Sequence, residues 1–228
     1  MSGLLVTGTD TGVGKTFVAC ALAHALRDRG RRVAVMKPVE TGVTDAPDDA
    51  VRLREAAADP APLDDICPYR LRAPLAPSVA ARMEGMTIDL AHLETLARRR
   101  SDAADVLLIE GAGGLLVPIA DSVTWADFAA RLRLPLLVVA ANRLGTVNHC
   151  ALTASVADAM GLAVAGFVLS NPTAERDTSA DTNPATIVAL TGLRFLGELR
   201  HGSDPAALAQ TLDVPALLSW LDRGAPGR

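Results

Sequence analysis

A glycine-rich stretch near the N-terminus carries the residue types that bind phosphate. Residues 4–26 read LLVTGTDTGVGKTFVACALAHAL, in which residues 14–16, Gly-Lys-Thr, form the ending of a phosphate-binding loop. The usual motif has a glycine, four further residues and then Gly-Lys-Thr or Gly-Lys-Ser. Here that first position holds Thr9, and Gly8 lies one residue earlier. We therefore predict a variant of this loop; the alternative is a glycine turn in which Gly-Lys-Thr is incidental.

A loop of this kind binds phosphate because a strand that turns through glycines into a helix points free backbone N–H groups at one place. The positive end of the helix dipole adds to the attraction. Lys15 would bring a full charge to the β- and γ-phosphates of a nucleotide, and the Thr16 hydroxyl could ligate the Mg²⁺ that bridges them. Gly12 and Gly14 would let the backbone approach the phosphates closely. The sequence therefore predicts a nucleoside triphosphate site.

A second lysine, Lys37, ends the next apolar run, immediately before Pro38. The proline favours an extended conformation at Lys37. A lysine at the carboxyl edge of a sheet, near the phosphate loop, could stabilise charge that develops on a phosphoryl or carboxyl group. The alternative is a surface lysine that extends from the strand end into solvent.

A carboxylate interrupts a third apolar run, VLLIE, which is followed by GAGG. Glu110 is costly in such a strand unless it is paired or holds a metal ion, and with Thr16 opposite, Mg²⁺ is the simplest explanation. Asp49 is a second candidate ligand, although either Asp49 or the adjacent Asp48 could instead be a helix N-cap. His149 could act as a base, but a structural or interface role is favoured because no acidic partner is evident nearby.

The elements that must position these residues alternate between apolar runs and helical patterns. Strands are expected at residues 4–10, 31–39, 104–114, 135–142, 162–171 and 194–200. Helices are expected at 14–29, 48–58, 78–84, 88–100, 124–132 and 146–161, with a proline-rich, irregular segment over 60–78. Near-continuous apolar strands separated by helices predict an α/β fold, a mostly parallel sheet with helices on both faces, in a single P-loop NTPase-like domain over residues 1–228.

Ligands of such sheets bind at the carboxyl ends of the strands. The segments expected to follow those ends contain nearly every chemically suggestive residue of the chain: 9–16, 37–41, 110–114 and 142–148, with residues 171 and 200. The sequence therefore predicts one site at this edge of the sheet.

Composition and charge exclude several kinds of partner. Of the 228 residues half are hydrophobic and 3% aromatic, and the net charge is −4, so neither a basic surface nor a stacking surface for nucleic acid is expected. No apolar run reaches the roughly 18 residues of a membrane span, and no secretory leader is recognisable. The cysteines Cys20, Cys67 and Cys150 lie far apart and are expected to be buried or idle thiols in a reducing cytosol. We expect a cytoplasmic protein.

Five segments carry a resemblance to a known family. GTDTGVGKT, KPVETG, IEGAGGLLVPIAD, TWADFAARLRLP and LGTVNHCALT occur here in the order seen in the dethiobiotin synthase family, and the match covers most of residues 3–172. The resemblance implies an ATP-dependent ligase of biotin biosynthesis, with ATP and Mg²⁺ as cofactors. Its substrates are 7,8-diaminononanoate and CO2. One amine captures CO2 as a carbamate, ATP phosphorylates the carbamate to a mixed anhydride, and the second amine closes the ring with release of phosphate.

The resemblance also assigns roles to residues. It makes Lys37 the catalytic lysine at the carbamate, with Lys15 as the link to the phosphates. It makes Thr16, Asp49 and Glu110 the metal ligands. The triphosphate would lie against Thr11, Gly12, Val13, Gly14, Lys15 and Thr16, and the reacting groups against Gly111, Ala112 and Gly113. Gly12 replaces a bulkier residue found in some relatives.

The remaining implied contacts concern the base, the diamine and a second subunit. Asn171 resembles the residue that reads the adenine edge, and the other expected base contacts are Pro172, Arg200, His201 and Gly202, where Arg200 replaces a common proline. Thr41 stands where the family contacts the diamine. The segment of Gly145, Thr146, Val147 and Asn148 resembles a loop of a homodimer interface, in which one subunit holds the substrate carboxylate for the other.

Two other interpretations compete with this one. The first is a nucleotide-switch ATPase of the partitioning type, which acts through protein partners; loops of that type carry a lysine where Asp10 stands here. The second is an amidating enzyme that acts on corrin precursors. We expect 228 residues to be too few for the glutamine-hydrolysing domain that such an enzyme needs, and no cysteine lies in a nucleophile context.

Overall fold

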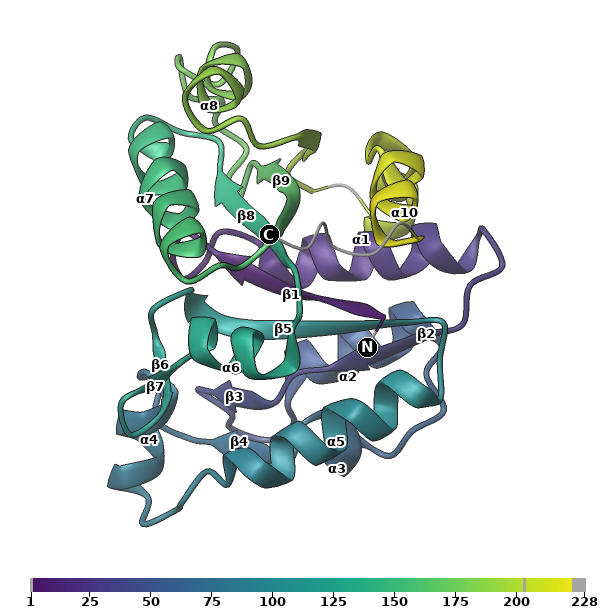
Figure 1. Cartoon of the computed structure of the whole chain (residues 1–228), viewed down its shortest axis with the longest axis vertical. Helices are drawn as coiled ribbons and strands as arrows, with labels where there is room; N and C mark the ends of the chain where they lie inside the picture. The colour runs from purple at the N-terminus through teal and green to yellow at the C-terminus, as the bar shows by residue number, and fades with distance from the viewer. Residues whose placement is uncertain (1, 203, 223–228) are drawn as a thin grey trace.

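A single parallel sheet forms the centre of the molecule. The computed structural model describes residues 2–202 and 204–222, and within them six parallel strands form the main sheet in the order β10-β9-β8-β1-β5-β2 (Figure 1). The strands are β1 (Gly3–Gly8), β2 (Val33–Met36), β5 (Val106–Gly114), β8 (Leu136–Ala141), β9 (Val164–Ser170) and β10 (Phe195–Leu199). The predicted α/β fold with a mostly parallel sheet is confirmed.

Helices cover both faces of this sheet because the strands are apolar on both sides. Leu4 and Val6 of β1 pack in one hydrophobic cluster and Leu5 in another. The first cluster includes α1 (Lys15–Arg27), α2 (Asp48–Ala57) and α10 (Val214–Asp222). The opposite face is covered by α5 (Leu90–Asp102), α6 (Trp125–Leu132) and α7 (Thr146–Ala159), and α8 (Asn183–Thr191) packs beside α7. Both clusters exclude water from the strands, which explains their near-continuous apolar sequence.

The expectation of an irregular segment over 60–78 is wrong in part. This segment contains α3 (Leu63–Ile66) and β4 (Tyr69–Leu71), and β4 pairs in parallel with β3 (Val39–Thr41). Each of these strands has only three residues, so no local pattern marks them; they form because two distant segments meet. The helix that follows is α4 (Pro77–Met83), close to the expected position.

Several further elements were not predicted. A short antiparallel pair, β6 (Pro118–Ala120) and β7 (Val123–Thr124), follows the glycines of β5. Near the C-terminus lie α9 (Pro205–Leu208) and a 3₁₀ turn (Ala209–Thr211), together with α8 and α10. In the described part of the chain, residues 2–202 and 204–222, no helix has both the length and the hydropathy to cross a bilayer.

The strand register brings the chemically important residues together. Met36 of β2 lies opposite Ile109 of β5, so the next residues, Lys37 and Glu110, are neighbours at the carboxyl end of the sheet. Their side chains point to the face covered by α1 and α2, because they alternate with Met36 and Ile109, which pack in the other cluster. The helices α1 and α2 begin at this same edge.

Candidate active site

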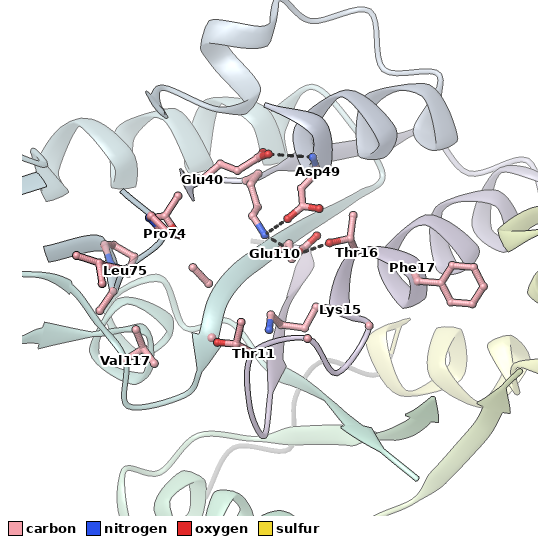
Figure 2. Close-up of a pocket in the computed structure, with 18 of the residues that line it drawn as sticks. Thr11, Lys15, Thr16, Phe17, Glu40, Asp49, Pro74, Leu75, Glu110 and Val117 are labelled. Atoms are coloured by element: carbon pink, nitrogen blue, oxygen red, sulfur yellow. Dashed lines mark hydrogen bonds and ion pairs between the residues drawn. The ribbon is translucent and has the colours of Figure 1, made fainter. Parts of the chain in front are cut away.

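A cavity of about 770 Å³ lies at the carboxyl edge of the sheet, between the glycine loop, the start of α2 and the segment before α4 (Figure 2). Predicted site residues that line it lie at the ends of three of the six expected strands, with Asp49 at the start of α2: Thr11, Gly12, Gly14, Lys15, Thr16, Lys37, Thr41, Asp49, Glu110, Ala112 and Gly113. Eight lining residues were not predicted: Phe17, Glu40, Arg52, Pro74, Leu75, Ala76, Pro77 and Val117.

The glycine loop has the backbone of a phosphate-binding loop. Gly12 and Gly14 have φ values of 73° and 85°, a region that favours glycine. A side chain at Gly14 would also collide with Ser170, since an added Cβ would lie 2.9 Å from its Oγ. The helix α1 starts at Lys15 with no side-chain cap and no acidic residue in its first turn, so its N-terminal N–H groups are available to an anion.

Lys15 is buried in this loop, and its Nζ donates a hydrogen bond to the carbonyl oxygen of Asp10 at 3.0 Å. Burial lowers the pKa of Lys15 below its ordinary value, although the carboxylate of Glu110 opposes the shift. The side chain of Val13, in the same loop, is instead buried in the hydrophobic core. The carbonyl oxygen of Val13 accepts a hydrogen bond from Ser170 Oγ. Val13 can therefore contribute only its backbone to a bound phosphate.

Lys37, Glu110, Asp49 and Thr16 form a compact charged cluster on one side of the cavity. Lys37 Nζ lies 2.5 Å from Glu110 Oε1 and 2.9 Å from Asp49 Oδ2. The Thr16 hydroxyl donates to the same Glu110 oxygen at 2.9 Å. Burial disfavours the Lys37 ammonium, but the two carboxylates outweigh it and raise the pKa of Lys37 above its ordinary value. The interpretation of Lys37 as a solvent-exposed surface lysine is thus wrong, since its side chain is 5% exposed.

Glu40 has a role that the sequence analysis missed. Its two carboxylate oxygens accept hydrogen bonds from the backbone N–H groups of Asp49 and Ala50, each at 3.0 Å. Glu40 therefore caps the N-terminus of α2 from another element and fixes the position of Asp49 (Figure 2). Burial raises the pKa of Glu40. A glutamate two residues after Pro38 in a buried segment was a signal that could have been noticed.

Neither aspartate of α2 is its N-cap. The N-cap residue is Pro47, and no side chain caps the helix from that position. Asp48 is exposed and does not line the cavity, whereas Asp49 does. Of the two, only Asp49 is placed where it could ligate a metal ion near Thr16 and Glu110.

The cavity has an apolar wall opposite the charged cluster. Its residues Pro74, Leu75, Ala76 and Pro77 precede and begin α4, and Val117 follows the glycines of β5. Figure 2 shows Pro74, Leu75 and Val117 on the side of the cavity away from α1. Such a site has room for an apolar chain beside a group of charges.

The other predicted residues lie outside this cavity. Gly111 is buried against Trp125: an added Cβ at Gly111 would lie 3.3 Å from the indole ring. The predicted base contacts, Asn171, Pro172, Arg200, His201 and Gly202, follow β9 and β10. The predicted interface residues, Gly145, Thr146, Val147 and Asn148, form the cap and first turn of α7. His149 is exposed on the same helix.

All three cysteines are free and buried, as predicted. Burial raises the pKa of Cys20 and of Cys67 to about 12, which leaves both as unreactive thiols. In the described residues, no three His, Cys, Asp or Glu side chains gather in a group that could hold a metal ion.

Comparison with known sequences gives a consistent result. A family described as an AAA domain matches residues 2–205. The "ATP-dependent dethiobiotin synthetase BioD" of Anaeromyxobacter sp. (strain K) is 50% identical over 213 residues, which cover 93% of this chain and 96% of the relative. The protein of the same name from Bacillus thuringiensis (strain Al Hakam) is 42% identical over 201 residues, which cover 87% of this chain and 83% of the relative.

Solved structures with a similar fold are more distant in sequence. The MinC:MinD cell division protein complex of Aquifex aeolicus contains a chain with a TM-score of 0.55 and 13% identity, with 98% of this chain and 95% of that chain covered. Chloroplast FtsY from Physcomitrella patens has a TM-score of 0.52 and 19% identity, with 95% and 64% covered. At these identities the likeness concerns the fold alone.

Proposed function

Since the chain belongs to the AAA-domain family and, within it, to the ATP-dependent dethiobiotin synthetases, which catalyse an ATP-dependent ring closure in biotin biosynthesis, we propose that this reaction takes place in the cavity below the glycine loop. The substrates are 7,8-diaminononanoate, CO2 and ATP. One observation carries the assignment: Lys37 and Lys15, from separate strand ends, line the same cavity as the glycine loop. These are also the only lysines in the sequence.

The two lysines serve the step in which two anions must meet. A carbamate formed from one amine and CO2 attacks the γ-phosphorus of ATP, ADP leaves, and the second amine then displaces phosphate from the carbonyl carbon. Lys37 offsets the charge of the carbamate, and Lys15 that of the phosphates. Ala112 and Gly113 lie beside the reacting groups, Gly111 supports them from its position against Trp125, and Thr11 to Thr16 hold the triphosphate.

Thr16, Asp49 and Glu110 are the residues that would hold Mg²⁺. Two carboxylates and a hydroxyl are the oxygen ligands that this ion takes beside nucleotide phosphates. Glu110 also has a carboxylate oxygen, Oε2, that is buried and has no hydrogen-bond partner among the described residues, so the donor set fits a cation. Bound there, Mg²⁺ would neutralise phosphate charge. Glu40 holds Asp49 in place for this purpose.

The apolar wall accommodates the alkyl chain of the diamine, with the Thr41 hydroxyl as a polar contact. Asn171 reads the adenine edge, with Pro172 and residues 200–202 beside the base. The cap and first turn of α7 belong to a homodimer interface, where Gly145, Thr146, Val147 and Asn148 of one subunit hold the substrate carboxylate for the other. Leu144, 81% exposed, and Leu152, 59% exposed, are apolar side chains available to such an interface. The compartment proposed is the cytoplasm.

A nucleotide switch of the partitioning type is not favoured. The likeness to the chain in the MinC:MinD complex concerns the fold alone at 13% identity, whereas the dethiobiotin synthetase relatives match at up to 50%. Asp10 occupies the loop position at which that class carries a lysine.

The function is tested by incubating the protein with 7,8-diaminononanoate, bicarbonate and MgATP, and by following product mass and ADP together. We expect ring-closed dethiobiotin and an equal amount of ADP, with ADP formation dependent on both the diamine and bicarbonate. Release of ADP at the same rate without the diamine would contradict the proposal.

A further inference from the structure

Asn171 lies one residue from a contact with the phosphate loop. The strand β9 ends at Ser170, whose hydroxyl donates to the carbonyl oxygen of Val13. A nucleotide with its phosphates on this loop has its base within reach of the residues that follow β9 and β10. This placement rests on the ATP site proposed above.

The side-chain amide of Asn171 has a fixed orientation. Its Nδ2 donates to Oε1 of Glu198 at 2.7 Å and lies 3.5 Å from the carbonyl oxygen of Leu199. Both partners can only accept, so Nδ2 must face β10 and Oδ1 must face away from it. No group in the described part of the chain donates a hydrogen bond to Oδ1. Asn171 therefore presents its acceptor, Oδ1, to a ligand, while Nδ2 is directed to β10.

Glu198 is itself held by a directed set of hydrogen bonds. The same Oε1 accepts from Asn142 Nδ2 at 2.8 Å, and this Nδ2 also donates to the carbonyl oxygen of Ala180 at 3.1 Å. The Oδ1 of Asn142 accepts from Asn183 Nδ2 at 2.9 Å. Because the Ala180 carbonyl cannot donate, the Asn142 amide cannot be turned over. The carboxylate of Glu198 is therefore held in place, and it in turn holds the Asn171 amide by a hydrogen bond.

We propose that Glu198 is a positioning residue that makes the site select nucleotides by the exocyclic group of the base. With Oδ1 presented, Asn171 accepts a hydrogen bond from an exocyclic amine, such as the 6-amino group of adenine. A 6-keto purine would place one acceptor against another and lose that bond. Glu198 does not touch the base; it acts through the amide of Asn171.

ATP and ITP provide a direct test, because they differ at the 6-position of the purine. We would measure the dissociation constant of each by calorimetry and kcat/KM with each in the ring-closure reaction. The wild-type protein should favour ATP by about tenfold or more. Glu198→Ala frees the Asn171 amide to turn over, so the ATP:ITP ratio should fall to within about threefold, while kcat with ATP changes little.

Two matched variants distinguish an effect on the orientation of the Asn171 amide from a general loss of structure. Glu198→Gln keeps an oxygen acceptor, which Asn142 holds in place, so the ratio should stay near the wild-type value. Glu175→Ala removes an exposed glutamate from the same region and should leave the ratio unchanged. Thermal unfolding of each variant shows that it is folded before its ratio is compared.

The ATP:ITP ratio of each variant decides whether the proposal holds. If Glu198→Ala keeps the wild-type ratio, or if Glu198→Gln loses it to the same extent as Glu198→Ala, the proposal is wrong. If Asn171→Ala loses the ratio and Glu198→Ala does not, Asn171 reads the base without Glu198, which also overturns the proposal. If discrimination in binding follows the expected pattern but no ring-closed product forms, the proposed reaction fails and this inference stands.

Discussion

The ammonium nitrogen of Lys37 lies 2.5 Å from Oε1 of Glu110, with only 5% and 1% of the two side chains exposed. This pair joins two neighbouring strand ends, and Asp49 joins it from α2. A buried pair of this kind is held for its position more than for its stability, because desolvation offsets much of the attraction. The residues proposed for catalysis are therefore also residues whose single loss should disturb folding.

Breaking this pair on one side should cost more stability than removing it altogether. Lys37→Met leaves the Glu110 carboxylate buried without its cation, and we expect the free energy of unfolding to fall by about 3–5 kcal/mol. The double variant Lys37→Met/Glu110→Gln removes both charges and should regain a large part of that loss. Urea unfolding of the wild type, Lys37→Met, Glu110→Gln and the double variant measures the coupling. Additive losses in the double variant would contradict the account.

Glu40 should control the position of Asp49. Glu40→Ala removes both cap contacts to α2, so the free energy of unfolding should fall by about 1–2 kcal/mol. The Mg²⁺ concentration for half-maximal activity should rise, because Asp49 is no longer held. Glu40→Gln keeps one acceptor oxygen and should be intermediate in both measurements. A Glu40→Ala protein with unchanged Mg²⁺ dependence would show that Asp49 is positioned without it.

The pKa values of the two lysines should be shifted in opposite directions from the ordinary value of a lysine. Burial lowers the pKa of Lys15 below 10.5, and the carboxylates of Glu110 and Asp49 raise that of Lys37 above it. Because the sequence has no other lysine, NMR of protein with ¹³C-labelled lysine shows two signals, which Lys15→Arg assigns. The ion pairs of Lys37 stabilise the fold below pH 10.5, and this contribution is lost as the pH rises through its folded-state pKa. Titration of Lys37 before Lys15 would contradict the structure.

The sequence predicted the strands that carry the site because each has a strong local signal. The glycine loop, Lys37 and Glu110 follow apolar runs, and the rule that ligands bind at strand ends placed them together. What was missed depends on contacts between distant segments. The pairing of β3 with β4 positions the segment that leads to the apolar wall. The cap from Glu40 to α2 joins residues 40 and 49 across a loop. Neither leaves a periodic pattern in the sequence.

Narrowing the cavity at its apolar wall should weaken binding of the diamine but not binding of ADP. Ala76→Leu places a larger side chain in the cavity next to Pro77, so less space is left for the diamine. Overpacking of this kind costs about 1–3 kcal/mol. We expect the KM for 7,8-diaminononanoate to rise about tenfold or more, with the affinity for ADP unchanged. Ala91→Leu, at an exposed position of α5, is the matched control and should behave as wild type. Equal losses of diamine and ADP binding would place the diamine elsewhere.

The most direct test of the central claim is the rate of ring closure by Lys37→Met at saturating MgATP, diamine and bicarbonate. If the Lys37 ammonium offsets the charge of the reacting anions, kcat should fall by roughly 10²–10³. The dissociation constant of ADP, measured by calorimetry on the same folded sample, should change by less than about threefold. A Lys37→Met protein that closes the ring within about threefold of the wild-type rate would contradict the account.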